Sequence, residues 1–486
     1  MASRAVCRVE SAVIRWCLPA VACAVVAMNT GPSIAGGAPL LRDVIDVGGR
    51  PYLRTVIRPL LSAAGDDDRS VYVRDGVCAY IAFAGHAPVQ DDALLLRHFG
   101  PDMQPLHDDA LVAVDPPNVY SAARGSGGTY VVWMPTAGYW QVMLSGIDVT
   151  GSPIIDPPAT VAVMPEGFQA GYTSVAVGES GTFVAFGIRN VEGNTRQELH
   201  GRWLALNGGF LTPQFPVSTL APHMSEGVYD SHVLGSGNAL VLGSQGTRTW
   251  DSMRAWVKLL SPTGSVIRTV DLDSLPSEGG AILQRSGGLS VVYMRITSGY
   301  QRVATILRKL DFELNTVGPD VELPLQTGFW TSAPDGRIAL AGVPNGALDI
   351  RVRLFDADGN AVSDWIDPAG PALAPPRKSQ WGLTTQGVAY DADGTVWVAF
   401  ESTEGGIRSY LSQLRPLPPG DLDGDGRLTN FDIDPFVLAL TNREAYQAAF
   451  PHIPPEAIDI LGDMNGDGVL TNFDIDPFVE ALVNGP

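Results

Sequence analysis

Cysteine is scarce in this chain of 486 residues: there are four, and Cys7, Cys17 and Cys23 lie near the N-terminus. Cys78 is the single cysteine of the remaining sequence. A form of the chain that has lost its N-terminal segment therefore has no second cysteine for an intrachain disulfide. Apolar neighbours on both sides of Cys78 predict a buried strand, so we interpret it as a small core residue and not as a nucleophile.

Basic residues are also few. The chain has 32 Lys and Arg against 52 Asp and Glu, a formal net charge of −20. Residues 420–486 hold 13 of the acids and only two arginines, which gives −11, more than half of the excess. Nucleic-acid binding requires a basic surface that neutralises phosphates. We therefore expect no nucleic-acid partner.

Long apolar runs are absent except at the N-terminus. There, three arginines precede the apolar stretch Cys17–Met28, and the small residues Ser33-Ile34-Ala35 follow. This order is typical of a secretory signal peptide, which we assign to residues 1–35 with cleavage near Ala35. The stretch is short for a membrane span. We expect a secreted or cell-surface-associated protein with no membrane span after cleavage; an uncleaved membrane anchor is the alternative.

Recognisable catalytic motifs are missing. The chain has no His-Glu-x-x-His zinc signature, no Gly-x-Ser-x-Gly elbow and no phosphate-binding loop. Glycoside hydrolysis needs two carboxylates at a set separation, and the sequence alone places no such pair. Acids near strand ends or loops are interpreted as solvated turn residues: Glu226, Glu278, Glu401 and Glu404. His98 and His107 are interpreted as part of a hairpin and its surface, and no catalytic residue is assigned.

Helical periodicity is nearly absent between residues 40 and 415, where short apolar runs alternate with turn residues, as in an all-β chain. A unit made of a glycine turn followed by a strand recurs in steps of 48–58 residues. Its seven copies are Gly76–Ile81, Gly128–Trp133, Gly181–Phe186, Gly237–Leu242, Gly288–Tyr293, Gly336–Ala341 and Gly394–Ala399. The step length fits one four-stranded propeller blade. We predict a mainly β fold, a seven-bladed β-propeller; a string of β-sandwich domains is the alternative.

The ends of this β domain suggest how its ring closes. The last unit stops early, before the proline-rich linker 416–420, whereas a spare hairpin at 42–57 precedes the first unit. We expect this hairpin to complete the last blade and so leave no exposed sheet edge.

Residues 421–486 contain one twelve-residue pattern twice. Aspartate or asparagine occupies positions 1, 3 and 5, glycine position 6, threonine position 9 and aspartate position 12. Calcium prefers six to eight oxygen ligands, which such a loop supplies from side chains and from the carbonyl of position 7. The candidate ligands of two Ca²⁺ ions are Asp421, Asp423, Asp425, Arg427, Thr429 and Asp432, and Asp463, Asn465, Asp467, Val469, Thr471 and Asp474. The alternative reading, that these segments are solvated Asp-Gly turns, applies better to Asp356–Gly359 and Asp391–Gly394, which lack the closing acid.

The closing aspartates, the preceding Gly-Asp pairs and the apolar Leu440 and Leu482 resemble a type I dockerin module. The resemblance covers about 65 residues. It implies calcium loops that are each followed by one helix without a regular entering helix, and docking onto a cohesin-like partner. Because Pro435 and Pro477 follow the loops closely, we expect helices at 435–441 and 477–483, capped by Asp434 and Asp476.

Together these features predict a secreted calcium-binding protein. Its dockerin-like tail would mediate calcium-dependent docking, and its propeller would be a scaffold that binds a carbohydrate or protein ligand. The alternative is a carbohydrate-active enzyme, a glycoside hydrolase or lyase, tethered by its tail to a polysaccharide-degrading assembly. A purely structural calcium clamp is a third reading of the tail.

Overall fold

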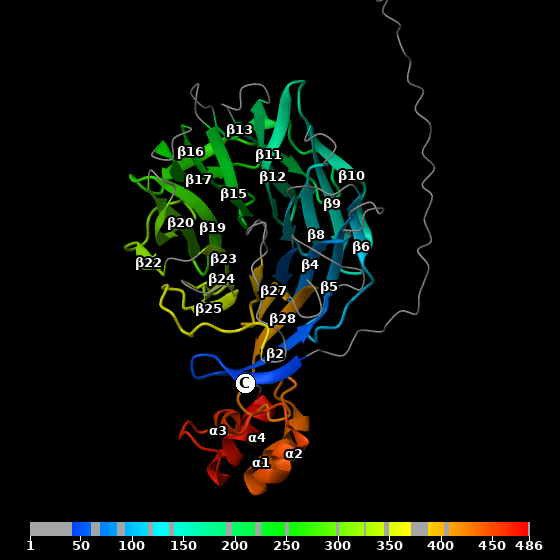
Figure 1. Ribbon diagram of the computed structural model, residues 1–486, viewed down its shortest axis with the longest axis vertical. Coiled ribbons are helices and arrows are strands. Elements are labelled where there is room, and N and C mark those ends of the chain that lie inside the picture. Colours follow the sequence, from blue (N-terminus) through cyan, green and yellow to red (C-terminus); the bar gives the residue numbers. More distant parts are fainter. Residues whose placement is uncertain are drawn as a thin grey trace, which may run out of the picture. The chain divides into compact units, whose positions relative to one another are not determined.

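The computed structural model describes residues 41–59, 69–84, 93–114, 120–135, 140–190, 197–218, 225–247, 252–297, 301–324, 327–344, 349–370, 387–402 and 408–484. It is mainly β, with a seven-bladed propeller arrangement followed by C-terminal helices (Figure 1). The predicted signal peptide, residues 1–35, lies outside the described residues. Among the helices described, none is long and apolar enough to cross a membrane.

The blades are antiparallel sheets that follow one another along the chain. Blade 1 contains β3 (Arg69–Arg74), β4 (Val77–Ala84), β5 (Ala93–Phe99) and β6 (Ala110–Val114). Blade 2 contains β7 (Tyr120–Arg124), β8 (Gly128–Trp133), β9 (Gln141–Asp148) and β10 (Pro153–Val163). Blade 3 contains β11 (Phe168–Val177), β12 (Thr182–Asn190), β13 (Gln197–Leu204) and β14 (Phe215–Pro216). Blade 4 contains β15 (Ser225–Val233), β16 (Ala239–Gly246), β17 (Arg254–Leu260) and β18 (Val266–Asp271).

The remaining blades differ more in strand number. Blade 5 contains β19 (Ser277–Arg285), β20 (Gly288–Ile296), β21 (Arg302–Leu310) and β22 (Val321–Leu323). Blade 6 contains β23 (Thr327–Ser332), β24 (Ile338–Val343) and β25 (Arg351–Phe355). Blade 7 contains β26 (Val388–Tyr390), β27 (Val396–Ser402) and β28 (Arg408–Pro416), and it is completed from the N-terminus by β2 (Pro51–Ile57) and β1 (Leu41–Asp46).

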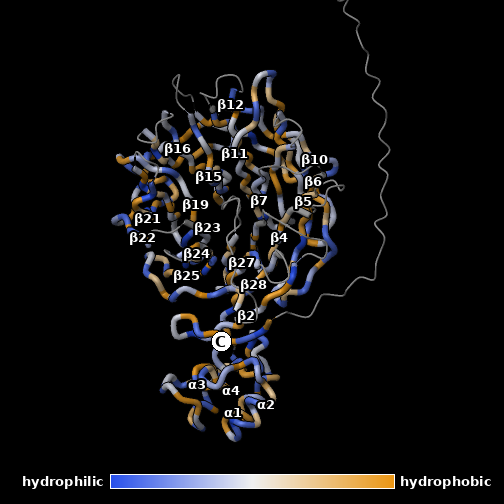
Figure 2. Tube along the Cα trace, in the orientation of Figure 1, coloured by the Kyte–Doolittle hydropathy of each residue, from blue (hydrophilic) through white to orange (hydrophobic). Residues whose placement is uncertain are grey.

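The seven glycine-plus-strand units of the sequence correspond to the second strands of the seven blades. These strands are β4, β8, β12, β16, β20, β24 and β27. Hydrophobic residues concentrate along such strands (Figure 2). They are buried on both faces because each blade packs against the next, which explains why the units are continuous apolar runs. The blade count predicted from the repeat is confirmed.

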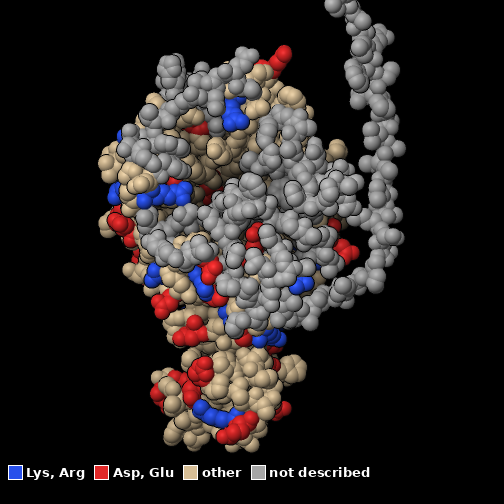
Figure 3. Space-filling model, in the orientation of Figure 1, with Lys and Arg blue, Asp and Glu red and all other residues tan. Residues whose placement is uncertain are grey.

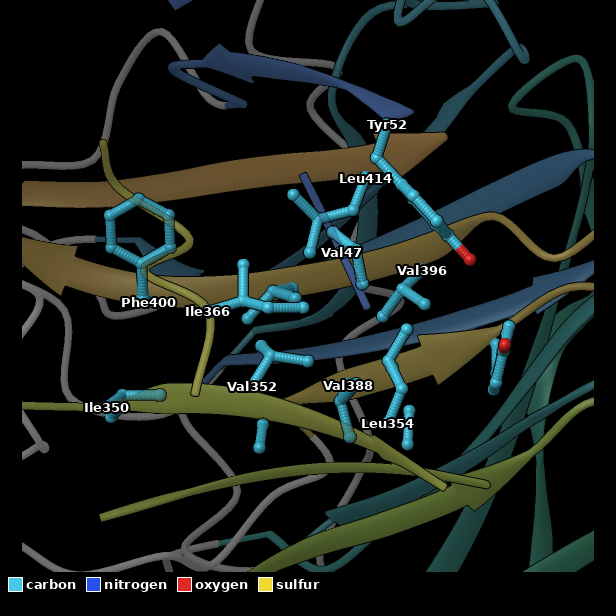
Figure 4. Close-up of a cluster of buried hydrophobic side chains, with 14 of the residues drawn as sticks. Val47, Tyr52, Ile350, Val352, Leu354, Ile366, Val388, Val396, Phe400 and Leu414 are labelled. Carbon is cyan, nitrogen blue, oxygen red and sulfur yellow. The ribbon is translucent and has the colours of Figure 1, made fainter. Parts of the chain in front are cut away.

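The predicted closure of the ring is also confirmed. β2 pairs antiparallel with β28 over six residue pairs, from Tyr52↔Pro416 to Ile57↔Leu411, and the blue N-terminal hairpin lies beside the orange β28 in Figure 1. Val47 and Tyr52 of the hairpin belong to the apolar cluster between blades 6 and 7 (Figure 4). The hairpin thus contributes both strand pairing and core side chains.

Polar side chains on the first strands of the blades, or in the turns that follow them, connect neighbouring blades. Ser174 Oγ and Ser231 Oγ lie 2.7 Å apart between blades 3 and 4. Asp230 accepts a hydrogen bond of 2.8 Å from the backbone N–H of Ile282 in blade 5. Asp391 of blade 7 accepts one of 2.8 Å from Gly76 N in blade 1. These bonds fix the register of one blade against the next around the axis.

Four α-helices and two 3-10 turns form the C-terminal module. They are η2 (Asn430–Asp432), α1 (Ile433–Thr441), α2 (Arg443–Ala449), α3 (Pro455–Gly462), η3 (Asn472–Asp474) and α4 (Ile475–Asn484). The module encloses an apolar core that includes Phe436, Tyr446, Leu461 and Phe478.

Two expectations about these helices were wrong. Helices α1 and α4 begin at Ile433 and Ile475, two residues earlier than predicted, and Asp432, not Asp434, is the N-cap of α1. Pro435 is tolerated because first-turn N–H groups have no intrahelical acceptor. In addition, α3 ends at Gly462, directly before the second loop, so this loop has an entering helix that the resemblance did not imply.

The segment 416–420, expected to be a linker, is packed. Leu417 is buried and donates its N–H to Pro51 O at 3.0 Å, and Gly420 N donates to Leu461 O at 2.7 Å. Leu417 shares an apolar cluster with Val44 and with the core of the C-terminal module.

Candidate calcium-binding module and propeller cavity

The first loop folds around the carboxylates at its two ends. Asp421 Oδ2 accepts the N–H of Gly426 at 2.8 Å. Asp432 Oδ1 accepts the N–H groups of Leu422 and Asp423 at 2.9 and 3.1 Å, and its Oδ2 accepts that of Thr429 at 2.8 Å. The closing aspartate therefore ties the end of the loop back to its beginning.

Three carboxylates of this loop converge. Oxygens of Asp421, Asp423 and Asp432 all lie within 4.8 Å of one another. Asp421 is fully buried, and its Oδ1 has no hydrogen-bond partner within the described part of the chain. Burial and the neighbouring carboxylates of Asp432, Asp423 and Asp425 raise the pKa of Asp421 to about 8. A buried, unpaired carboxylate oxygen that faces further carboxylates fits a bound divalent cation, because a cation is the partner that this geometry lacks.

Hydrogen bonds within the first loop connect its predicted ligands to the backbone. Asp423 Oδ1 accepts the N–H of Asp425 at 2.9 Å, and Asp425 Oδ1 accepts that of Arg427 at 2.8 Å. Thr429 Oγ1 accepts the N–H of Phe431 at 3.1 Å and so caps η2. The hydroxyl predicted as a ligand at position 9 therefore also starts the exit helix.

The second loop repeats this hydrogen-bond pattern. Asp463 Oδ2 accepts the N–H of Gly468 at 2.8 Å, and Asp474 Oδ1 accepts those of Met464 and Asn465 at 2.8 and 3.0 Å. Asp467 Oδ1 accepts the N–H of Val469 at 3.1 Å and Thr471 Oγ1 that of Phe473 at 3.2 Å, as at the matching positions of the first loop. The neutral Asn465 replaces the second carboxylate, and residues 465–469 are exposed. The two loops thus have the same pattern of backbone hydrogen bonds but differ in charge and burial.

The glycine at position 6 of each loop has the predicted conformation. The φ angles of Gly426 and Gly468 are 89° and 93°, a region that side chains with a Cβ rarely adopt. In calcium loops of this kind, a turn at position 6 precedes the carbonyl ligand of position 7, which is the contribution expected of Arg427 and Val469.

Helices α1 and α4 leave an exposed apolar face. A groove of about 370 Å³ between them is lined by matching residues of the two repeats, including Ile433, Val437, Ile475 and Val479. Phe431 and Phe473, which precede the lining residues Ile433 and Ile475 by two positions in the sequence, are each 73% exposed. Exposed apolar residues that gather in one place mark interaction surfaces more often than scattered ones do.

A second candidate site lies in the propeller, in a cavity of about 1510 Å³. Part of the hollow is visible on the face drawn in Figure 3. Its lining includes Tyr172 of β11 and Tyr229 of β15, which are 62% and 41% exposed. The pairing of each strand with its neighbour shifts register at these tyrosines. Such bulges redirect side chains, and sequence reasoning did not identify either tyrosine.

The interpretation of three glutamates as solvated turn residues was wrong. Glu226, Glu278 and Glu401 are only 1%, 2% and 7% exposed. They lie on blade strands, where neighbouring strands supply partners: Glu226 binds Lys258 at 3.1 Å and Glu278 binds Arg302 at 2.7 Å. Glu404 lies outside the described residues.

Four of the acids that line the cavity serve the fold. Glu226 and Glu278 form the ion pairs given above, and Asp230 and Asp391 accept the backbone hydrogen bonds that link neighbouring blades. Burial raises the pKa of Asp230 to about 6. Because these contacts explain each of the four acids, their geometry alone does not assign an acid–base pair for glycoside hydrolysis.

Comparison with known proteins assigns no family to the chain. No family model and no curated protein matches the chain. Similar solved structures include the β-propeller domain of the Trilobed protease from Pyrococcus furiosus, with 7% identity, coverage of 72% of this chain and 94% of that chain, and a TM-score of 0.41. A subtype N11 neuraminidase-like protein of A/flat-faced bat/Peru/033/2010 shows 10% identity, coverage of 78% and 97%, and a TM-score of 0.38. Pyrococcus horikoshii acylaminoacyl peptidase shows 8% identity and a TM-score of 0.41; the match covers 70% of this chain but only 52% of the peptidase. None of these similarities is strong enough to transfer an activity.

Proposed function

We propose that the chain is a secreted calcium-binding protein. Its dockerin-like C-terminal module takes two calcium ions and docks onto a cohesin-like partner, and its propeller is a scaffold that binds a ligand. The observation that carries the calcium proposal is the buried Asp421 Oδ1, which has no hydrogen-bond partner among the described residues and converges with Asp423 and Asp432. The spacing of oxygen-bearing residues in both loops supports it further.

Calorimetric titration of the mature chain with calcium tests this proposal. We expect the wild-type chain to bind two ions. The variants Asp421→Asn and Asp463→Asn should each bind one, because position 1 anchors each loop. Asp356→Asn is the matched control, since Asp356 begins an Asp-x-Asp-Gly turn that lacks a closing acid. Its stoichiometry should stay at two. No calcium uptake by the wild-type chain would overturn the proposal.

The docking role is supported by the exposed apolar face of the module. Phe431 and Phe473 occupy loop position 11 and are largely exposed, and the groove between α1 and α4 begins two residues later in each repeat, at Ile433 and Ile475. Their apolar side chains favour a partner surface with apolar pockets over one that offers mainly hydrogen bonds. The two repeats present matching residues, so a partner that fits one repeat should also fit the other.

The docking proposal can be tested with an immobilised cohesin-like domain from the source organism. Calcium-dependent capture should fall at least about tenfold in the double variant Phe431→Ala/Phe473→Ala, because each truncated anchor removes a large apolar contact. Each single variant should lose less. Leu275→Ala, which removes an exposed propeller side chain, should bind as the wild type does. Capture that is equal with calcium and with chelator would contradict the proposal.

The scaffold role is supported by the propeller cavity and its exposed tyrosines. Aromatic faces in a hollow can stack on sugars or on peptide side chains. Screening the mature chain against neutral glycans and against peptides separates these two ligand classes. Tyr172→Ala and Tyr229→Ala should weaken any binding that uses the cavity, and Tyr172→Ala should leave the melting temperature nearly unchanged, because its side chain is 62% exposed.

A further inference from the structure

The ring of the propeller is closed by hydrogen bonds and packing. We call the β2–β28 pairing the closure seam; it joins the N-terminal hairpin to the last strand of the β domain. The one cysteine of the described residues, Cys78, is buried and free, so no disulfide within this part of the chain reinforces the seam. The strength of the seam therefore depends on what packs against it.

The first calcium loop contacts both sides of the closure seam. On the N-terminal side, Arg42 of β1 donates from Nη2 to Gly424 O at 2.8 Å. On the C-terminal side, Arg415 of β28 donates from Nη2 to Gly426 O at 2.7 Å. Arg415 is also the direct strand partner of Leu53 in β2. Two guanidinium groups from opposite sides of the seam thus bind carbonyls only two residues apart.

A third contact strengthens this connection. Val44 of β1 donates its N–H to His452 O at 3.1 Å, and the ring of His452 lies with Nε2 3.1 Å from Asp423 O, a carbonyl of the first loop. Val44 and Leu53 also share an apolar cluster with Leu422, inside the loop, and with the helices of the module. The loop is therefore part of the structure that covers the seam.

The second loop provides an internal comparison. A Cβ placed on Gly426 would lie 2.3 Å from Arg415 Cζ, whereas one placed on Gly468, its equivalent, would meet nothing within 4 Å. Likewise, a Cβ on Gly424 would lie 2.7 Å from His452 Nε2, whereas one on Gly466 would meet nothing within 4 Å. The two loops have the same backbone pattern, but the first is packed against the propeller where the second is open.

We propose that the calcium ion of the first loop locks the propeller ring, whereas the ion of the second loop does not. The carbonyls that Arg42 and Arg415 bind alternate with the carboxylates of Asp423 and Asp425. Without a cation these carboxylates repel one another and the loop loses its fixed shape, so the two arginines lose their acceptors. With calcium bound, the loop holds both sides of the seam together. This inference rests on the proposed calcium binding, and it gives the first site a structural role inside the chain.

Hydrogen exchange of the full mature chain tests the lock. Chelation should speed exchange in β2 and β28 about tenfold or more, since even one lost hydrogen bond to a charged group is worth about that factor. The variant Asp421→Asn should reproduce the effect in the presence of calcium, and Asp463→Asn should not. Strand β16 of blade 4, three blades before the seam in blade 7, is the internal reference.

Three further variants separate the contact with the seam from the folding of the loop. Arg415→Gln should loosen the seam while the chain still binds two ions. Gly426→Ala and Gly468→Ala impose the same backbone strain, because both glycines have φ near 90°, but only the first should loosen the seam. If calcium binds and the seam exchanges equally fast in Asp421→Asn and in the wild type, the lock is wrong and the proposed function stands. If no calcium binds, the proposed function fails first.

Discussion

The rings of Phe436 and Phe478 stack with their centroids 4.0 Å apart and their planes inclined by 20°. They occupy the same position in the two repeats, in α1 and in α4. Each repeat therefore completes the core of the other, which gives a physical reason why the ten residues from Leu428 to Val437 recur unchanged from Leu470 to Val479. A single copy would leave its phenylalanine without the partner ring.

Truncating either ring should therefore destabilise the module by a similar amount. Phe436→Ala and Phe478→Ala should each cost about 3–5 kcal/mol of unfolding free energy, as buried Phe→Ala changes do. Phe431→Ala is the matched control, because that ring is 73% exposed, and it should stay within about 0.5 kcal/mol of the wild type. Urea unfolding in saturating calcium measures all three. A loss in Phe436→Ala as small as in the control would show that the stacked pair does not hold the module together.

Much of the β domain could be predicted because its signal is local. A glycine turn followed by an apolar run such as Val396–Phe400 predicts a buried strand without knowledge of the neighbouring strands. The number of copies of this pattern predicts the number of blades. The closure by the N-terminal hairpin was predictable because the last unit lacks strands and an additional hairpin precedes the first unit. The loop glycines were predictable for a similar reason: Gly426 and Gly468 satisfy a local backbone requirement.

The features that depend on distant partners could not be predicted. The sequence around Glu226 predicts a solvated residue, because its partner, Lys258, comes 32 positions later and reaches it only when the strands of the blade pair. The exposure of Tyr172 depends on a register shift between β11 and β12. The early start of α1 depends on η2, which leads the chain into the helix before Pro435.

The pair formed by Lys258 and Glu226 supports a second prediction. Both side chains are buried, and burial raises the pKa of Glu226 and lowers that of Lys258. Lys258→Met should cost about 3–5 kcal/mol because it leaves a buried carboxylate without its cation. Adding Glu226→Gln should recover a large part of that loss, since it removes the charge.

A surface pair gives the control for this experiment. Lys309 binds Asp358, whose side chain is 74% exposed. Lys309→Met should change the free energy of unfolding by less than about 1 kcal/mol. Chemical denaturation at pH 7 measures each variant. Equal losses at the two lysines would contradict the assignment of a buried, structurally coupled pair in blade 4.

Asp230 supports a third prediction, about the contact between blades 4 and 5. Its Oδ2 is the acceptor for the N–H of Ile282. Asp230→Ala should cost about 1–3 kcal/mol because it leaves a donor in the interior without its partner. Hydrogen exchange should show faster exchange at the Ile282 amide in particular. Asp311→Ala, which removes acceptors within an exposed turn, should leave that amide unchanged; an unaffected Ile282 amide in Asp230→Ala would count against the blade contact.

His98 lies in a chain of hydrogen bonds whose proton positions can be derived. Arg124 can only donate, and its Nη1 lies 3.0 Å from His98 Nε2, so this nitrogen carries no proton. The proton of His98 is therefore on Nδ1, which donates to His107 Nε2 at 2.8 Å. His107 in turn donates from Nδ1 to Asp108 O. The fold thus holds His98 neutral and fully buried, which corrects its interpretation as part of a hairpin surface.

Acid should therefore destabilise the protein through His98. Burial, together with the positive charge of Arg124 and the electrostatic interaction with the His107 ring, lowers the pKa of His98 to about 3, and Asp148 opposes this only in part. The unfolded chain binds a proton below about pH 6.5, where the folded chain does not, so the stability contribution is complete above that pH and falls by about 1.4 kcal/mol per pH unit below it. Between pH 7 and pH 5 the wild type should lose about 2 kcal/mol more unfolding free energy than His98→Gln.

The comparison with the variant is needed because Asp230, whose pKa is raised to about 6, binds a proton in the folded state and changes stability in the opposite direction. Urea unfolding of both proteins at the two pH values gives the result, and parallel losses would show that His98 is not held neutral by the fold.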